Sequence, residues 1–299
     1  MLTLDEKKIR KGKPVGLPYV GSKKKISKKI VEIIKQNFGT DKTVYDVFGG
    51  GGAITAELMT NGIDVVYNDL DTTITDMFNR VLNKDREWLK TLIVSRDEFF
   101  TIRDKEHKAV DDELKLLVNS FGNDRKNYLY SKKISDVKYN LAVYIIKKED
   151  VLSGYKKTAT YQRVVNLYEE ELGFVDKEEK DRTLQQLQRL QQLERLQQLN
   201  SYPDTKNKDY KYFSNVKNSI LYLDPPYETT ETGSYTSQID YQEFYDWAYE
   251  MQKNNIVLLS SYEVSDNRFE CVYEFKTAVS TFSGGNDGKR TEKLFMVKC

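Results

Sequence analysis

Residues 43–69 read TVYDVFGGGGAITAELMTNGIDVVYND, and this stretch decides the fold that the sequence predicts. TVYDVF (43–48) and IDVVYND (63–69) are rich in β-branched and aromatic residues, which is typical of strands. Between them, a run of glycines precedes AITAELMT, which reads as a helix closed by Asn61-Gly62. A strand, a glycine-rich turn, a helix and a second strand form a βαβ unit. The unit predicts a Rossmann-like α/β fold with a doubly wound parallel sheet.

The same alternation of strands and helices returns in the last third of the chain. The expected strands are SILYLD (219–224), NIVLLSSYE (255–263), FECVYEFK (269–276) and EKLFMVKC (292–299), and the expected helix is YQEFYDWAYEMQK (241–253). Near the N-terminus, SKKKISKKIVEIIKQNFG (22–39) predicts an amphipathic helix with Ser22 as its cap and Gly39 as its stop. We therefore expect one sheet domain split into residues 1–72 and 205–299.

The segment from 73 to 204 has another pattern and is expected to be an inserted, mostly helical subdomain. Within it, FGNDRKNYLYSKK (121–133) combines turn residues with a short strand-like run, which favours a β-hairpin. Leucine recurs at every third residue from 184 to 199. Three residues turn a helix by about 300°, so these leucines circle it and form no coiled-coil seam. This indicates a low-complexity helix that ties the insertion back to the sheet domain.

Composition excludes several classes of protein. The chain has 299 residues and no run of about 18 apolar residues, so we expect no membrane span. Its first residues contain no apolar stretch, so we expect no secretory signal. Cys271 and Cys299 cannot form a disulfide framework, which favours a cytoplasmic setting. The single histidine, His107, lies in a charged stretch that favours a solvated helix residue. Zinc sites and histidine triads are thereby nearly excluded, and the chemistry should rest on carboxylates, backbone groups, aromatics or a cofactor, without a metal.

The net charge of +1 conceals an asymmetry. Residues 1–35 hold eleven lysine or arginine residues against three acidic ones, and a second basic cluster lies at 125–138. Tyrosines stand among these cations, which suits stacking on nucleic-acid bases. Basic patches on a near-neutral chain fit a polyanionic partner, although solvated surface charge explains them equally well.

The strongest chemical motif is Asp224-Pro225-Pro226-Tyr227, directly after the apolar run ILYL. Proline donates no ladder hydrogen bond, so the strand must end in a stiff loop at the sheet edge where α/β proteins bind ligands. Asp224 and the Pro225 carbonyl can accept hydrogen bonds from an exocyclic amine while Tyr227 stacks on the ring. The alternative is a rigid turn with a surface tyrosine.

The second motif is the glycine run after the first strand, together with Asp69 at the end of the next one. Glycines let a ligand approach the backbone closely, and Asp69 is well placed for ribose hydroxyls. Because the run is contiguous, it matches a dinucleotide fingerprint poorly. A flexible turn is the alternative interpretation.

Taken together, Phe48-x-Gly50-x-Gly52, Asn68-Asp69 and the 224–227 motif resemble the Dam-like adenine-specific DNA methyltransferases, which use S-adenosylmethionine. The segment 18–23 (PYVGSK) is similar to the opening motif of that family, and Asp209-Tyr210 to its acid–aromatic pair. The closing stretch 289–292 and the Leu/Gln-rich segment look like phage-borne members. The well-known members carry an Asn-Arg-aromatic-aromatic-Asn-Gly hairpin where this chain has NSFGNDR (119–125), which leaves the DNA sequence that is read open.

The resemblance implies site-specific methylation of an adenine flipped out of double-stranded DNA, with a GATC-like site as one candidate target. It implies that the base and its amine are held by Asp224, Pro225, Pro226 and Tyr227. It implies that S-adenosylmethionine is held by Tyr19, Lys23, Phe48, Gly50, Gly52, Asp69, Asp209 and Tyr210. The insertion would recognise the target, with DNA contacts from Asn123, Arg125, Lys126, Tyr128, Lys132 and Lys133.

Three alternatives stay open from the sequence. The same chemistry could act on adenine in RNA. The chain could be a decayed methylase that only binds DNA, although its motifs are intact. It could also be an interaction protein organised by the Leu/Gln helix, for which the leucine spacing gives little support.

Overall fold

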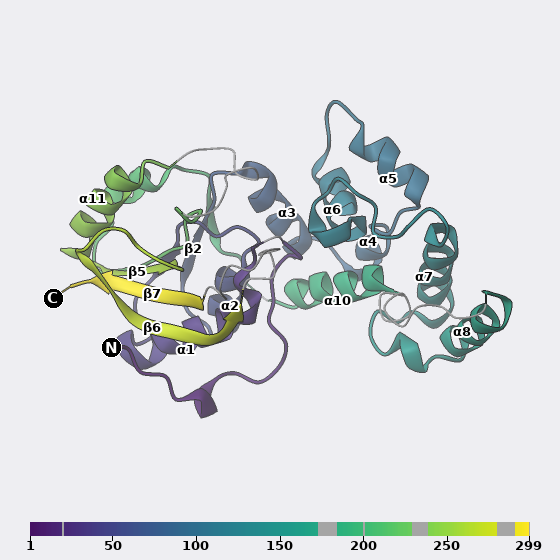
Figure 1. The fold of residues 1–299 in the computed structure, drawn as a ribbon, viewed down its shortest axis with the longest axis horizontal. Coiled ribbons are helices and arrows are strands. Elements are labelled where there is room, and N and C mark those ends of the chain that lie inside the picture. Colours follow the sequence, from purple (N-terminus) through teal and green to yellow (C-terminus); the bar gives the residue numbers. More distant parts are fainter. Residues whose placement is uncertain (20, 173–183, 200, 229–238, 280–290, 299) are drawn as a thin grey trace. The chain divides into compact units, whose positions relative to one another are not determined.

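The computed structural model describes residues 1–19, 21–172, 184–199, 201–228, 239–279 and 291–298. The chain forms two compact units (Figure 1). The first unit comprises Met1–Gly16, Ser22–Thr75 and Ser201–Cys299, and the second comprises Leu17–Gly21 and Asp76–Asn200. Among the described residues, no helix is both long and apolar enough to cross a membrane.

The described part of the first unit contains a seven-stranded sheet with the order β3-β2-β1-β4-β5-β7-β6. Strands β1 to β5 run parallel, whereas β7 lies antiparallel between β5 and β6. The expected α/β class with a doubly wound sheet is confirmed. The strands are β1 (Val44–Asp46), β2 (Val65–Asn68), β3 (Asp204–Lys206), β4 (Ile220–Leu223), β5 (Ile256–Ser261), β6 (Phe269–Val279) and β7 (Thr291–Val297).

Both faces of this sheet are covered, as β4 shows most clearly. Ile220 and Tyr222 belong to the apolar cluster on one face, while Leu221 and Leu223 belong to the cluster on the other. Because successive strand residues point to opposite faces, a strand buried on both sides must be apolar throughout. The first cluster includes side chains of α1 (Ser27–Phe38) and α2 (Ala53–Thr60), and the second includes those of α11 (Tyr241–Gln252).

The N-terminal end of α1 differs from the prediction. Ser22 makes no capping hydrogen bond with its side chain, because a 3-10 turn at Lys23–Lys25 comes first and the α-helix begins only at Ser27. The C-terminal end is as expected: α1 ends at Phe38, and Gly39 follows with a φ of 83°.

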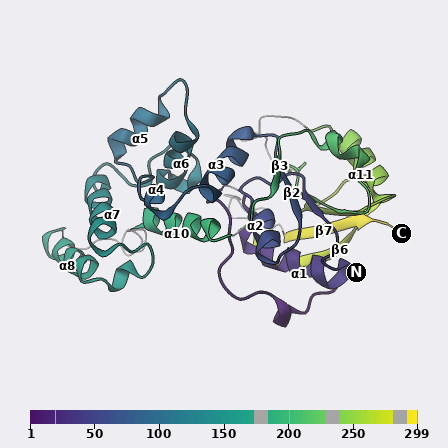
Figure 2. The same ribbon diagram turned by 180° about the vertical axis from the view of Figure 1, so that it is seen from behind.

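The second unit is helical, and α10 lies at its centre. Five of the repeated leucines are fully buried in and beside α10, namely Leu184, Leu187, Leu190, Leu193 and Leu196. The helix packs on α4 and α6, beside which it lies in Figures 1 and 2. Because these leucines circle the helix and all five are buried, neighbouring segments pack on several sides of α10. The helices are α3 (Thr72–Leu82), which crosses the boundary, α4 (Arg86–Lys90), α5 (Arg96–Arg103), α6 (Val110–Asn119), α7 (Ser135–Glu149), α8 (Ala159–Leu172) and α10 (Gln185–Gln197).

Buried polar side chains join α10 to the end of α6. Arg189 donates hydrogen bonds to the carbonyls of Leu117, Val118 and Ser120 at distances of 2.6 to 3.3 Å. These carbonyls belong to the end of a helix, where intrahelical partners are missing. Burial lowers the pKa of Arg189 to about 10, so the guanidinium remains charged at neutral pH.

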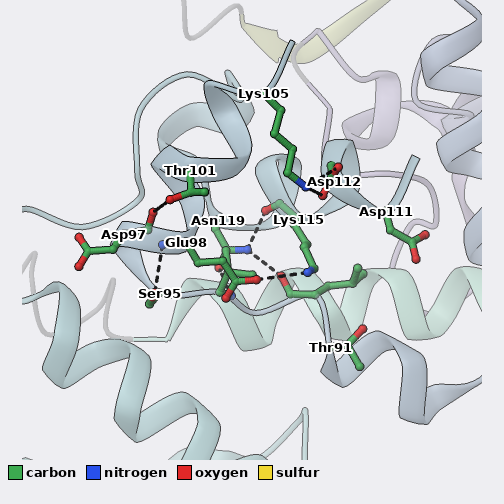
Figure 3. A network of polar contacts seen from close by, with 12 residues as sticks. Thr91, Ser95, Asp97, Glu98, Thr101, Lys105, Asp111, Asp112, Lys115 and Asn119 are labelled. Atoms are coloured by element: carbon green, nitrogen blue, oxygen red, sulfur yellow. Dashed lines mark hydrogen bonds and ion pairs between the residues drawn. The ribbon is translucent and has the colours of Figure 1, made fainter. Parts of the chain in front are cut away.

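Asn119 joins the same end of α6 to the chain before α5. Its amide donates to the carbonyls of Leu92 and Lys115, both at 2.7 Å, and its Oδ1 accepts from Gln186 at 2.6 Å. Figure 3 shows Asn119 within this network, beside the ion pair of Lys115 with Glu98 at 3.2 Å.

The hairpin predicted for 121–133 is wrong. The chain forms a 3-10 turn at Phe121–Asn123 and a single bridge between Ser120 and Tyr128. Gly122, Asn123 and Arg125 have φ values of 60°, 62° and 59°, so the backbone bends too sharply for a strand ladder. Burial follows no alternation either, because Tyr128, Leu129 and Tyr130 all pack into one apolar cluster.

His107 also differs from its prediction. Its side chain is 95% exposed, as expected, but it lies in the connection between α5 and α6 instead of within a helix.

We expect Leu190→Ala to destabilise the second unit by about 2–5 kcal/mol, because the shortened side chain leaves a cavity between α10 and the residues packed on it. The two tryptophans of the chain lie in different units, Trp88 in α4 and Trp247 in α11. In a Trp247→Phe background, urea unfolding followed by fluorescence therefore reports on the second unit alone. The exposed Gln198 supplies the control: Gln198→Ala should change the unfolding free energy by less than about 0.5 kcal/mol. Equal effects of the two substitutions would contradict the central position of α10.

Candidate functional site

The two chemical motifs leave the sheet from neighbouring strands. The glycine run follows β1 and the 224–227 motif follows β4, and β1 pairs in parallel with β4 along Val44↔Ile220. From β1 the sheet is extended by β2 and β3 on one side, whereas from β4 it is extended by β5 on the other side. The order in which the chain adds strands therefore changes direction between β1 and β4. Open α/β sheets bind ligands at such a switch point.

Asp224 is held by a lysine from the N-terminal segment. Lys23 Nζ donates to Asp224 Oδ1 at 2.6 Å, and the side chain of Asp224 is 16% exposed. Burial raises the pKa of Asp224 to about 6, although the nearby Lys23 lowers it. Burial also opposes the charge of Lys23, but Asp224 and Glu292 outweigh this effect and raise its pKa. The pair is therefore ionic at neutral pH.

Tyr227 is fixed at its hydroxyl and at its ring. The hydroxyl accepts a hydrogen bond from Lys23 at 2.5 Å and donates one to Glu292 Oε1 at 2.6 Å. The ring meets Tyr262 edge to face, with 4.5 Å between centroids. The loop before it is tied to α11, because the hydroxyl of Tyr241 donates to the carbonyl of Pro226.

Glu292 is a site residue whose role the sequence analysis missed. It lies on β7 with 5% exposure, and Ser260 on β5 donates a second hydrogen bond to its Oε1 at 2.8 Å. A signal was present, since Glu292 shares its strand face with the buried Leu294 and an acid on a buried face needs a partner.

The glycine run makes a tight turn against β2. A Cβ atom on Gly49 would lie 2.5 Å from the ring of Tyr67, and Gly50 has a φ of 47°. Asp69 closes the turn, because its Oδ2 accepts from the Gly50 amide at 2.8 Å and its Oδ1 from the Asp71 amide at 2.9 Å. Burial raises the pKa of Asp69. Glycine is therefore required at position 49 by close packing on Tyr67, and it is favoured at position 50 by the positive φ.

An aromatic group stands beside this turn. Phe48 lies 6.2 Å from Tyr210 between ring centroids, and Tyr210 packs on Phe244 and Trp247. Asp209 begins the 3-10 helix Tyr210–Asn215 by accepting from the Lys211 amide. The structure thus brings together Phe48, Gly50, Gly52, Asp69, Asp209 and Tyr210 at the ends of β1, β2 and β3.

Asn68 holds these strand ends in place. Its amide donates to the carbonyls of Val47 at 2.7 Å and Lys208 at 3.0 Å, and its Oδ1 accepts from the Lys208 amide at 2.9 Å. A buried side chain of this kind is satisfied by backbone groups, and it fixes the approach of 207–210 to the glycine turn.

The remaining candidates lie in the second unit, which includes Tyr19 in its segment Leu17–Gly21. Lys126, Lys132 and Lys133 are exposed. Arg125 is paired with Glu113 at 2.9 Å, and the Oδ1 atom of Asn123 is buried. The ring of Tyr128 is only 5% exposed and its hydroxyl donates to the Val94 carbonyl, so it serves the core of this unit. Residues 289 and 290 lie outside the described part.

A comparison with protein families finds one match over most of the chain. The model of D12 class N6 adenine-specific DNA methyltransferases matches residues 19–283, which include the glycine run, residues 76–200 of the second unit and the 224–227 motif. Glu292 lies beyond the matched range. A search of curated proteins finds no match.

Asp46, the buried acid before the glycine run, is expected to make the free energy of unfolding depend on pH. Its Oδ2 accepts from the amide and hydroxyl of Thr55, while Oδ1 has no partner, and burial raises its pKa from 3.8 to about 7. The folded state then holds the proton more tightly than the unfolded state. The stabilisation that this proton gives is complete below pH 3.8 and is lost as the pH rises through about 7.

Asp46→Asn should therefore raise the unfolding free energy more at about pH 8 than at about pH 5. Urea unfolding in a Trp88→Phe background measures this in the first unit through Trp247. The exposed Asp64 serves as control, since Asp64→Asn should give the same difference at both pH values. A pH-independent effect of Asp46→Asn would contradict the raised pKa.

Proposed function

The chain belongs to the family of D12 class N6 adenine-specific DNA methyltransferases, and from this membership we propose that it transfers the methyl group of S-adenosylmethionine to the N6 amine of an adenine flipped out of double-stranded DNA. The resemblance read from the motifs is thereby confirmed at the level of the family, and the protein is an adenine-specific DNA methyltransferase. The observation that carries the finer proposal is the position of Asp224 and Tyr227 at the switch point of the sheet.

The base is proposed to lie against the 224–227 loop. An adenine inside a duplex hides its amine, so it must leave the stack before it can react. Stacking on Tyr227 would offset about 1–3 kcal/mol of the unstacking cost. The hydroxyl of this tyrosine is held by Lys23 and Glu292, which makes the ring a rigid platform.

Asp224 and the Pro225 carbonyl are proposed to accept the two hydrogens of the amine. The amine lone pair is delocalised into the ring, and two acceptors draw the nitrogen towards a tetrahedral geometry in which that lone pair can attack. The carboxylate must be ionised to do this, which the pKa of about 6 permits at neutral pH. Catalysis then consists of orientation and electrostatic stabilisation, and it needs no histidine or cysteine.

The residues around the glycine run fit S-adenosylmethionine. When bound, the cofactor supplies a methyl group activated by its sulfonium. Phe48, Gly50 and Gly52 would hold its methionine part; Gly50 and Gly52 have φ values of 47° and 67°, a backbone conformation that favours glycine. Each carboxylate oxygen of Asp69 accepts one backbone hydrogen bond and retains capacity for a ribose hydroxyl. Asp209 and Tyr210 would contact the adenine moiety.

Two residues need a revised assignment. Lys23 was expected at the cofactor, but its hydrogen bonds to Asp224 and Tyr227 support a place in the base site. Tyr128 was expected to contact DNA, whereas its burial supports a structural role in the second unit.

The second unit is proposed to recognise the target. The exposed Lys126, Lys132 and Lys133 are its candidates for phosphate contacts. A GATC-like sequence remains one candidate for the DNA sequence that the second unit recognises. Methylation of RNA adenine is the second candidate activity, supported by the same amine-binding groups.

Asp224→Ala is expected to lower methyl transfer by at least about 100-fold while cofactor binding persists, because one of the two amine acceptors is lost. Tritiated S-adenosylmethionine offered with duplex DNA, single-stranded DNA, RNA and protein measures the activity, and calorimetry measures cofactor binding. Asp64→Ala, an exposed aspartate in the same unit, should keep full activity. Undiminished transfer by Asp224→Ala would refute the mechanism, and labelling of RNA alone would replace the proposed substrate.

Replacement of the three exposed lysines Lys126, Lys132 and Lys133 by alanine should flatten the salt dependence of DNA binding. Each lost phosphate contact reduces the slope of log K against log salt by about 0.9. Fluorescence anisotropy with labelled duplex DNA at several salt concentrations measures this slope. As a matched control, alanine at the exposed first-unit lysines Lys217, Lys253 and Lys298 should leave the salt slope unchanged. An unaltered slope in the first variant would show that its lysines are only solvated charges.

A further inference from the structure

Lys23 faces two carboxylates instead of one. Its Nζ lies 2.6 Å from Asp224 Oδ1 and 3.7 Å from Glu292 Oε1. All three side chains are largely withdrawn from solvent, with 11% exposure for Lys23, 16% for Asp224 and 7% for Glu292. When all three are ionised, one positive charge faces two negative ones, so the cluster keeps a net negative charge beside the place proposed for the amine.

Glu292 is built into the cluster as a carboxylate. Its Oε1 accepts from the hydroxyls of Tyr227 at 2.6 Å and Ser260 at 2.8 Å. Because the Tyr227 hydroxyl accepts from Lys23, its own proton points to Glu292, and the three groups form a directed chain. These hydrogen bonds fix the hydroxyl end of the Tyr227 ring and the positions of the charged groups of Lys23 and Glu292.

We propose that Glu292 is a positioning residue for methyl transfer: it shares the ammonium of Lys23 with Asp224, which keeps the amine site negative, and it holds Tyr227 by its hydroxyl. This inference rests on the proposed function. In the transfer, the N6–carbon bond forms as the carbon–sulfur bond breaks. The positive charge therefore passes to N6, which returns to neutrality by releasing one proton to water.

The charge balance explains why a second acid is useful. A neutral Lys23–Asp224 pair would attract the developing positive charge on N6 only weakly, since the two fields largely cancel. Glu292 restores the attraction in a site of low dielectric, where charges act more strongly than in water. The chain also carries this acid outside residues 19–283, the range that matches the family.

Other groups that titrate or carry charge face the same cluster. Tyr222 comes from β4, Tyr262 follows β5, and Asp46 from β1 acts on Asp224 through space. Asp46 adds negative charge only when it is ionised, since burial raises its pKa to about 7, and Lys23 supplies the opposing charge. Glu292 raises the pKa of Asp224 by repulsion, so its neutralisation should lower that pKa.

The test uses Glu292→Gln in the full-length protein. The amide oxygen can still accept from Tyr227 and Ser260, so charge is removed while the hydrogen bonds can persist. Single-turnover methyl transfer should slow by about 10- to 100-fold, with unchanged affinities for S-adenosylmethionine and duplex DNA. The acid limb of kcat/KM should move to lower pH, because Asp224 then titrates lower. A purely structural defect would slow the reaction without that movement.

Two further variants complete the design. Glu292→Asp keeps the negative charge but moves it farther from Lys23. Its rate of methyl transfer and the pH of its acid limb should lie between those of the wild type and of Glu292→Gln. Glu270→Gln, at an exposed position on β6, is the matched control and should behave as the wild type. Trp247 fluorescence confirms that each variant is folded.

The outcomes separate the two proposals. A wild-type protein that methylates no adenine refutes the proposed function. An active wild type with an unchanged rate and acid limb in Glu292→Gln overturns the role of Glu292. If the Gln variant does not fold, Glu292→Asp decides, and wild-type values in both measurements overturn the inference.

Discussion

The parallel pairing of β1 with β4 is the contact on which the site depends. It aligns Val44 with Ile220, although residues 76–200 of the second unit lie between them in the chain. Because the two strands point the same way, the glycine run and the 224–227 loop emerge side by side at one edge of the sheet. The groups proposed to hold the methyl donor and those proposed to hold the acceptor are therefore set by one ladder of backbone hydrogen bonds.

Electrostatics then decides what this edge can do. Asp46 ends β1, while Asp69 and Asp224 directly follow the neighbouring strands β2 and β4, and burial raises the pKa of each. A site so rich in acids attracts cations to the extent that the acids are ionised, whether the cation is a lysine ammonium or a sulfonium. Lys23 is the residue that meets this charge in the structure, and its position links the N-terminal segment to the chemistry.

Much of the first unit could be predicted because its signals are local. ILYL is apolar at every position since both faces of β4 are covered, and Gly49 falls where a side chain would strike Tyr67. The strand β3 escaped prediction because DTK is short and polar. The partners of Lys23 and the role of Glu292 escaped it for another reason. Lys23 meets Asp224 and Tyr227 across about 200 positions, and Glu292 meets Tyr227 and Ser260 across 65 and 32 positions. No pattern within one segment names these partners.

The leucine repeat of α10 has a consequence for how the second unit finds its structure. In a segment where leucine returns every three residues, a slip by three exchanges leucine for leucine, so apolar burial distinguishes poorly between neighbouring alignments. Arg189 breaks this degeneracy, because a slip by three in either direction would put Gln186 or Gln192 where its guanidinium meets three carbonyls. The alignment of the helix is thus specified by its buried polar residues, while the leucines supply the cohesion.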